Sequence, residues 1–89
     1  MTTYSRDEIL TTVTQIVAAQ FGTSPAQLTP DVDLRQIEGA DSVKVLRSVA
    51  KIEQRYDIEL EDEDVFSAKR LDDVVNVIEK TLARDGGPR

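Results

Sequence analysis

The chain has 89 residues and a formal net charge of −6, a length that suits one domain with a single small core. It contains no cysteine and no histidine, which excludes disulfides, thiolate zinc sites and the usual general base of hydrolases. The acidic charge argues against nucleic-acid binding, and the sequence contains neither a membrane-spanning run nor the basic and apolar regions of a signal peptide. We therefore expect a monomeric, cytoplasmic protein.

The first predicted helix covers residues 5–21. Ser5 and Glu8 have the spacing of a capping box, in which the serine caps the helix and the glutamate follows three residues later. One apolar stripe follows at helical spacing: Ile9, Val13, Ile16, Val17 and Phe21. Gly22 is expected to end this helix, and residues 1–4 before it are expected to be a loose end.

Residues 22–41 form a long connection between the first two helices. Ser24-Pro25 predicts a short helical turn that reaches Leu28, and Thr29-Pro30-Asp31 predicts a second turn. Four apolar residues are expected to face inward and fix this connection to the core: Leu28, Val32, Leu34 and Ile37. A connection this long in so small a domain counts against the assignment unless the loop is functional or crosses the bundle.

The second predicted helix covers residues 42–56, which contain neither glycine nor proline. Asp41 is placed to cap it by accepting a hydrogen bond from the first turn. Ser42 then lies in that first turn, with its hydroxyl exposed beside the positive end of the helix dipole. This position favours an anion, including a phosphate ester formed on the serine itself.

Three faces of this helix differ in chemical character. The core face is expected to contain Val45, Val49, Ile52 and Tyr56, and a basic stripe contains Lys44, Arg47, Lys51 and Arg55. The third face, nearest Ser42, contains Val43, Leu46 and Ala50, and is either additional core or a small exposed apolar surface. The basic stripe is likewise either an ordinary solvated surface or a recognition surface.

Six acidic residues lie between positions 57 and 64. They are expected to form a solvated acidic rim in a loop that leads into a short helix near residues 62–66, with Val65 and Phe66 turned into the core. The spacing Asp57-x-Glu59-x-Glu61 resembles a calcium loop, but Asp62 stands where the sharp turn of such a loop needs glycine. We therefore expect no metal site.

The last predicted helix covers residues 69–82. Its core stripe contains Leu71, Val74, Val75, Ile78 and Leu82. Asp72 and Asp73 in the first turn, and Lys80 and Arg84 near the end, complement the helix dipole. Residues 84–89 are expected to be a flexible tail, so the ordered core of this single domain is expected to cover residues 5–82.

Autonomous catalysis at Ser42 is not expected. A serine nucleophile needs an adjacent base, an orienting group and an oxyanion hole. The chain has no histidine, and the sequence around the serine, Ala-Asp-Ser-Val-Lys, is not the Gly-x-Ser-x-Gly of a nucleophile elbow. The sequence therefore predicts a protein that is not an enzyme.

The run Gly39-Ala40-Asp41-Ser42-Val43, followed by a helix and then by Tyr56-Asp57-Ile58-Glu59-Leu60, resembles the attachment site of acyl carrier proteins. The resemblance covers about residues 5 to 82. It implies that 4′-phosphopantetheine is attached covalently to Ser42 and carries acyl groups as thioesters, while Asp41 caps the helix beside it. It also implies partners: a phosphopantetheinyl transferase, which uses coenzyme A and magnesium, and the acyl transferase, ligase and synthase enzymes of a pathway.

One feature departs from the pattern of that family. Acyl carrier proteins usually show acidic residues along this helix, whereas here Lys44 follows the attachment motif and the helix is basic. The resemblance implies that partner enzymes contact Val43, Lys44, Leu46, Arg47 and Ala50. The altered charge favours dedicated partners over the general enzymes of fatty-acid synthesis.

These observations predict an all-α fold: a small antiparallel bundle of three main helices and one short helix, with a long first loop. The predicted function is that of a discrete (type II) acyl carrier protein in polyketide or other specialised biosynthesis rather than bulk fatty-acid synthesis. One alternative is a peptidyl or aryl carrier of nonribosomal peptide assembly, although Gly39-Ala40-Asp41-Ser42 fits the motifs of those carriers less well. The other is a helical interaction module that is never modified.

Overall fold

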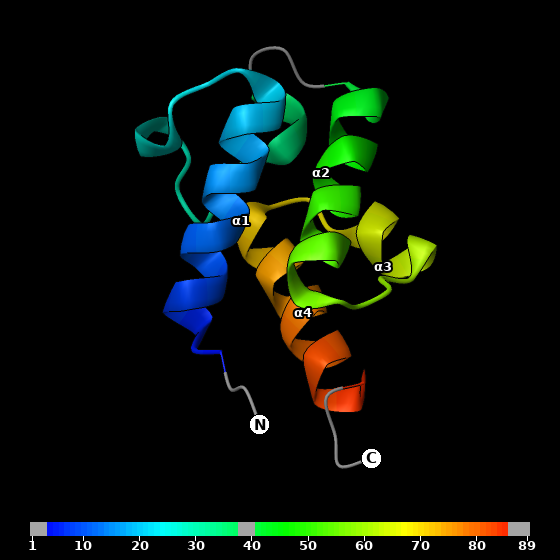
Figure 1. Cartoon of the computed structure of the whole chain (residues 1–89). Coiled ribbons are helices and arrows are strands. Elements are labelled where there is room, and N and C mark those ends of the chain that lie inside the picture. The colour runs from blue at the N-terminus through cyan, green and yellow to red at the C-terminus, as the bar shows by residue number, and fades with distance from the viewer. Residues whose placement is uncertain (1–3, 38–40, 86–89) are drawn as a thin grey trace.

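The structure is a computed structural model of the whole chain, and it describes residues 4–37 and 41–85. In this described part of the chain, four α-helices follow one another: α1 (Arg6–Phe21), α2 (Ser42–Tyr56), α3 (Asp62–Ser67) and α4 (Leu71–Asp85). Two 3₁₀ turns, η1 (Pro25–Gln27) and η2 (Leu34–Gln36), lie in the long connection. In Figure 1, α1 runs in the direction opposite to α2 and α4 and packs against both. The all-α antiparallel architecture predicted from the sequence is confirmed.

Helix α1 begins and ends where its sequence predicts. The Ser5 side chain accepts a hydrogen bond of 3.1 Å from the Glu8 backbone N–H, which satisfies one of the free donors of the first turn. Gly22 ends the helix in the left-handed conformation with φ of 72°, and its N–H donates to the Ala18 carbonyl. The buried stripe on this helix consists of Ile9, Val13, Val17, Ala18 and Phe21.

The long connection is pinned to the start of α4 by its backbone. The Leu34 N–H donates to the Lys69 carbonyl at 2.9 Å, and the Asp72 N–H donates to the Pro30 carbonyl at 2.8 Å. Leu28, Leu34 and Ile37 are buried and Val32 is half-buried, as predicted. The predicted turn at Pro25 is η1, whereas η2 and the pairing with the start of α4 were not predicted.

The acidic segment after α2 is a loop that is held by hydrogen bonds to Glu53. Asp57 takes the left-handed conformation with φ of 54° and ends α2, with its N–H bonded to the Glu53 carbonyl. The Glu53 carboxylate accepts a hydrogen bond of 2.9 Å from the Leu60 N–H. The short helix α3 then covers Asp62–Ser67, close to the predicted range.

Two predictions about the ends of the ordered region were wrong. The Tyr4 ring packs edge-on against the Tyr56 ring, with 4.9 Å between the centroids, so Tyr4 is part of the fold rather than a loose end. Helix α4 continues to Asp85 instead of ending near residue 82, and its Arg84 pairs with Glu61 at 3.1 Å. Residues 1–3 and 86–89 lie outside the described residues.

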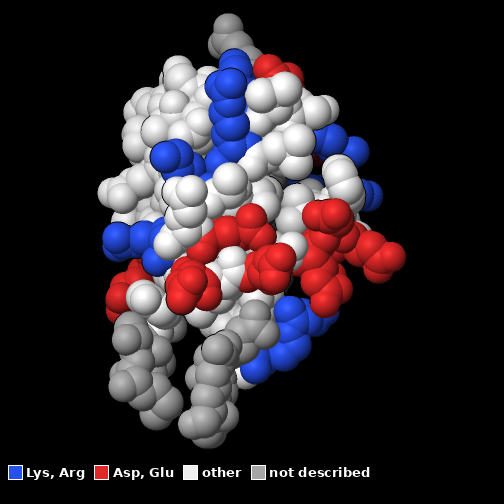
Figure 2. Space-filling model, turned by 45° about the vertical axis from the view of Figure 1, so that its right-hand side comes forward, with Lys and Arg blue, Asp and Glu red and all other residues white. Residues whose placement is uncertain are grey.

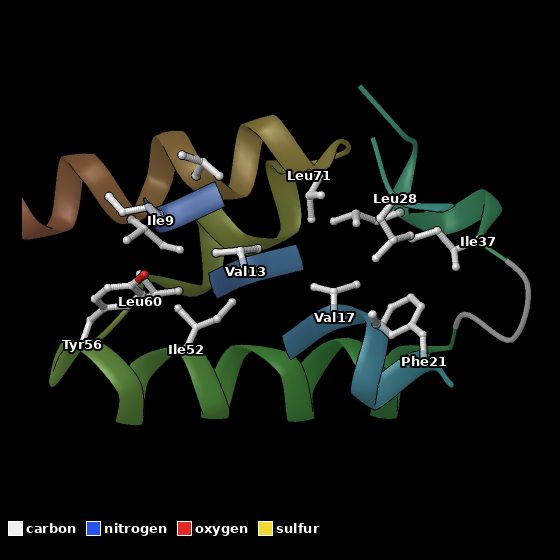
Figure 3. Close-up of a cluster of buried hydrophobic side chains, with 14 residues drawn as sticks. Ile9, Val13, Val17, Phe21, Leu28, Ile37, Ile52, Tyr56, Leu60 and Leu71 are labelled. Atoms are coloured by element: carbon white, nitrogen blue, oxygen red, sulfur yellow. The ribbon is translucent and has the colours of Figure 1, made fainter. Parts of the chain in front are cut away.

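The core lies where α1, α2 and α4 meet. Figure 3 shows side chains from these helices and from the connections pointing toward one another, among them Val13, Ile52 and Leu71. The most deeply buried large side chains are Ile9, Val13, Ile52, Leu71, Val75 and Ile78. On the outer side of the core, the Arg6 guanidinium joins α1 to Asp72 and Glu79 of α4.

The prediction that Phe66 turns into the core was wrong. Its side chain is 78% exposed, whereas its neighbour Val65 is half-buried and packs against the core. Adjacent residues of a helix point about 100° apart, and the single short helix α3 meets the rest of the molecule on one side. Val65 takes the inward direction, so Phe66 faces outward.

Candidate functional site

The candidate site begins at the first turn of α2, where the sequence placed it. Asp41 caps the helix, and its carboxylate accepts a hydrogen bond of 2.8 Å from the Lys44 backbone N–H. Ser42 is the first residue of the helix and is exposed. Gly39 and Ala40, which belong to the predicted attachment motif, lie outside the described residues.

The Ser42 hydroxyl differs from the other serine hydroxyls of the chain. Each of the other four, on Ser5, Ser24, Ser48 and Ser67, forms a hydrogen bond within the protein. Within residues 4–37 and 41–85, the Ser42 hydroxyl has no such partner. It is therefore an exposed hydroxyl that is not used by the fold.

The backbone around Ser42 suits a negatively charged group. Asp41 satisfies the Lys44 N–H, while the Ser42 and Val43 N–H groups of the same turn point out of the helix end without a bond to the described residues. Free N–H groups and the positive end of the helix dipole together stabilise an anion such as a phosphate ester. The first turn of α2 therefore fits a phosphate attached to Ser42.

Ser42 and Asp41 also line a cavity of about 610 Å³ that the sequence did not reveal. Its wall is formed mainly by aliphatic and aromatic side chains from all four helices, for example Val17 of α1, Val49 of α2, Val65 of α3 and Val74 of α4. Val45 and Val49 were predicted to face the core, and they are half-buried because they line this cavity. An apolar group attached near Ser42 would find a matching apolar space beside it.

The third face of α2 is exposed, which decides between the two interpretations left open by the sequence. Val43 is 55% exposed, Leu46 is 57% exposed, and Ala50 is exposed as well. These three residues, called the apolar patch below, are therefore not additional core. The patch begins one residue after Ser42.

The basic stripe of α2 is largely free of intramolecular partners. Arg47, Lys51 and Arg55 are exposed, whereas Lys44 is half-buried. Among the described residues, none of the four forms an ion pair. Their charge is therefore available to another molecule.

The acidic rim is partly neutralised from α4. Asp64 pairs with Lys80 at 3.6 Å, and Glu61 pairs with Arg84. Figure 2 shows acidic side chains as a band across one face of the molecule, with basic side chains gathered above and below it.

The described part of the chain contains no group of three or more acidic side chains placed to hold a metal ion. It also contains no helix long and apolar enough to span a membrane.

Sequence reasoning missed two residues of this region. Ser48 was assigned to none of the three faces of α2, yet it is buried and lines the cavity. Its position, four residues before the buried Ile52 and three after Val45, was the available signal. Phe66, predicted to lie in the core, instead lines the cavity while remaining exposed.

Comparison with known proteins gives a consistent result. The protein family described as phosphopantetheine attachment site matches residues 11–78 of this chain. A curated protein named acyl carrier protein from Exiguobacterium sp. (strain ATCC BAA-1283 / AT1b) is 33% identical over 78 residues, which cover 88% of this chain and 99% of that protein.

Two solved structures have the same fold. The acyl carrier protein from Enterococcus faecalis has a TM-score of 0.71 and 26% identity, over 88% of this chain and 99% of that chain. The holo acyl carrier protein from Geobacter metallireducens has a TM-score of 0.74 and 23% identity, over 86% of this chain and 88% of that chain.

Proposed function

This chain belongs to the acyl carrier protein family, whose members are carriers rather than enzymes and hold a covalently attached 4′-phosphopantetheine, and we propose that Ser42 is the attachment residue. Ser42 lies within the matched residues 11–78. The observation that carries the proposal is its hydroxyl, which is exposed at the start of α2, unused by the fold and placed on the rim of the apolar cavity.

The residues around Ser42 fit the group that the family carries. In the proposed attachment, the Ser42 oxygen forms a P–O bond to the pantetheine phosphate of coenzyme A and loses its proton, while the pyrophosphate P–O bond breaks and the adenosine bisphosphate leaves. Asp41 satisfies the Lys44 N–H of the first turn, and the N–H groups of Ser42 and Val43 would be the free donors available to stabilise the negative charge of the phosphodiester. Once bound, the arm supplies the thiol that holds the acyl group.

The cavity gives the protein a second role in this proposal. Its apolar wall begins at Ser42 and continues between the helices to Ile52 and Val74. An acyl chain in this space would remove apolar surface from water, at about 25 cal/mol per Å². The protein would thus shelter the acyl group between encounters with enzymes.

We assign the pathway to polyketide or other specialised biosynthesis rather than to bulk fatty-acid synthesis. The support is the charge of α2, where Lys44, Arg47, Lys51 and Arg55 stand against the single acid Glu53. A basic surface repels basic enzyme faces and attracts acidic ones, which restricts the set of enzymes that bind. A carrier of peptidyl or aryl groups, and an unmodified interaction module, are the competing functions.

The proposed partner surface is the apolar patch together with the cations beside it. Val43, Leu46 and Ala50 are exposed next to Ser42, and Lys44 and Arg47 lie between them along the helix. An enzyme that reaches an arm on Ser42 must approach this end of α2. The apolar residues would supply buried contact area, while the cations would steer the encounter.

The test is intact mass spectrometry after incubation with a broad-specificity phosphopantetheinyl transferase, coenzyme A and magnesium. The wild-type protein should gain one phosphopantetheine, and Ser42→Ala should gain none. Ser67→Ala is the matched control, because Ser67 is also an exposed helical serine. No gain by wild-type protein that circular dichroism shows to be folded would favour the unmodified module.

A further inference from the structure

Among the residues that the structure describes, the wall of the cavity contains one buried hydroxyl. Ser48 is 4% exposed, and its neighbours on the cavity side of α2 are the aliphatic residues Val45, Val49 and Ile52. The other polar residues that line the cavity, Arg35, Asp41 and Ser42, are exposed. A polar atom among aliphatic side chains marks one position in the cavity where a bound molecule can form a hydrogen bond.

The hydrogen bonds of Ser48 define which kind of group it can receive. Its hydroxyl donates to the Lys44 carbonyl at 2.9 Å, so its only proton is already used. A serine oxygen also has two lone pairs, and these remain available to accept a hydrogen bond. The complementary group is therefore a donor, an O–H or N–H, rather than a carbonyl.

Ser48 lies within reach of a group held on Ser42. The two serines are six positions apart on α2, which corresponds to about 9 Å along the helix axis. Both line the same cavity. A group that enters the cavity from Ser42 can therefore reach the wall that contains Ser48.

We infer that Ser48 is a specificity-determining residue that selects carried acyl groups with a hydroxyl substituent near the thioester, such as 3-hydroxyacyl groups. The inference rests on the proposed function, because it needs an arm on Ser42. The amide N–H groups of the arm have the same donor chemistry as such a hydroxyl. The experiment must therefore separate the arm from its cargo.

The chain provides a control for a purely structural role of a buried hydroxyl. Thr81 of α4 is 2% exposed and donates to the Val77 carbonyl at 2.9 Å, in the same geometry as Ser48. Hydroxyls that bond to the carbonyl four residues earlier are common in helices and need no ligand. Thr81 does not line the cavity, so its hydroxyl should be indifferent to cargo.

The experiment compares three forms of the full chain. In the first, Ser42 holds the arm without an acyl group; in the second and third, the arm holds a hexanoyl or a 3-hydroxyhexanoyl group. Each form is prepared from the corresponding coenzyme A derivative. The thermal unfolding midpoint is measured for wild-type, Ser48→Ala and Thr81→Val proteins, with intact mass as proof of loading. In the wild type and in Thr81→Val, the hydroxyacyl form should unfold at a higher temperature than the hexanoyl form. In Ser48→Ala this difference should disappear.

A second measurement uses the rate at which hydroxylamine cleaves the thioester, which falls when the acyl group is sheltered. The wild type should protect the hydroxyacyl form more than the hexanoyl form, and Ser48→Ala should protect both equally. Equal unfolding midpoints and equal cleavage rates for the two acylated wild-type forms would overturn the inference. It would also be overturned if Ser48→Ala lowered the unfolding midpoint of the form with the unloaded arm as much as that of the hydroxyacyl form. Failure to attach the arm to Ser42 is a separate outcome: it would overturn the proposed function and, with it, this inference.

Discussion

Asp41 determines the local geometry of the candidate site at the scale of a single residue. Its carboxylate satisfies the Lys44 N–H and fixes the first turn, and Ser42 occupies the next position with an unused hydroxyl. A cap at this place sets the direction in which the serine projects as well as stabilising the helix. The same residue therefore contributes to folding and to the site.

Replacement of Asp41 by alanine should destabilise the protein by about 1 kcal/mol, because the Lys44 N–H loses its partner. The measurement is urea unfolding followed by circular dichroism. Asp41→Asn is the matched control, since asparagine is an equally good cap and only the charge is lost. Equal destabilisation by both substitutions would show that the charge of Asp41 matters and the cap does not.

Helix α2 combines three surfaces of different chemical character at the scale of the element. Its inner face contains Ile52 and Tyr56 and packs on α1, while the apolar patch and the basic stripe remain outside. The stripe gives this helix a positive face on a molecule whose net charge is −6. Such a separation of charge orients an approaching partner.

Charge reversal of the stripe tests whether it recognises a partner. Arg47 and Lys51 are both exposed, so changing them to glutamate should leave the fold intact. With the cognate acyl-loading enzyme, kcat/KM should fall by about tenfold or more at low salt, and the loss should shrink as salt screens the charges. The measurement is loading kinetics at two ionic strengths.

The matched control for this experiment is the double change of Lys69 and Arg70 to glutamate. These exposed cations lie outside α2, before the first turn of α4, and the change in net charge is the same. If the control reduces kcat/KM as much as the α2 variant, the effect comes from net charge, and the stripe is not a recognition surface.

The helices and caps could be predicted from the sequence because their causes are local. Ser5, Gly22 and Asp41 act on backbone groups within a few residues, and the apolar stripes show which side of each helix is buried. The cavity could not be predicted, because it is the space left between residues as distant in sequence as Val17 and Val74. The burial of Ser48, by contrast, could have been predicted from its spacing to Val45 and Ile52 on the same helix.

The whole molecule has one core, and the two phenylalanines lie on opposite sides of its boundary. Phe21 is 5% exposed and ends the buried stripe of α1, whereas Phe66 is 78% exposed on α3. The side chains are identical, so burial alone separates their contributions to folding. The sequence placed both in the core: Phe21 continues the helical stripe of Val13 and Val17, whereas Phe66 lies in a helix of six residues, which is too short to show which of its sides is buried.

Phe21→Ala should destabilise the protein by about 3 kcal/mol, at the lower end of the usual range because Phe21 already borders a cavity. Phe66→Ala should change the free energy of unfolding by less than about 0.5 kcal/mol. Urea unfolding of the two variants checks both values. A large loss for Phe66→Ala would contradict the exposed position of this side chain.

The attachment of phosphopantetheine to Ser42 is tested most directly by locating the attached group with peptide mass spectrometry. Trypsin cleaves after Arg35 and Lys44, and the peptide of residues 36–44 contains a single hydroxyl residue, Ser42. After incubation with a phosphopantetheinyl transferase, coenzyme A and magnesium, this peptide alone should gain the mass of one phosphopantetheine. An unmodified peptide from folded protein, or a gain on any other peptide, would contradict the assignment of Ser42 as the attachment residue.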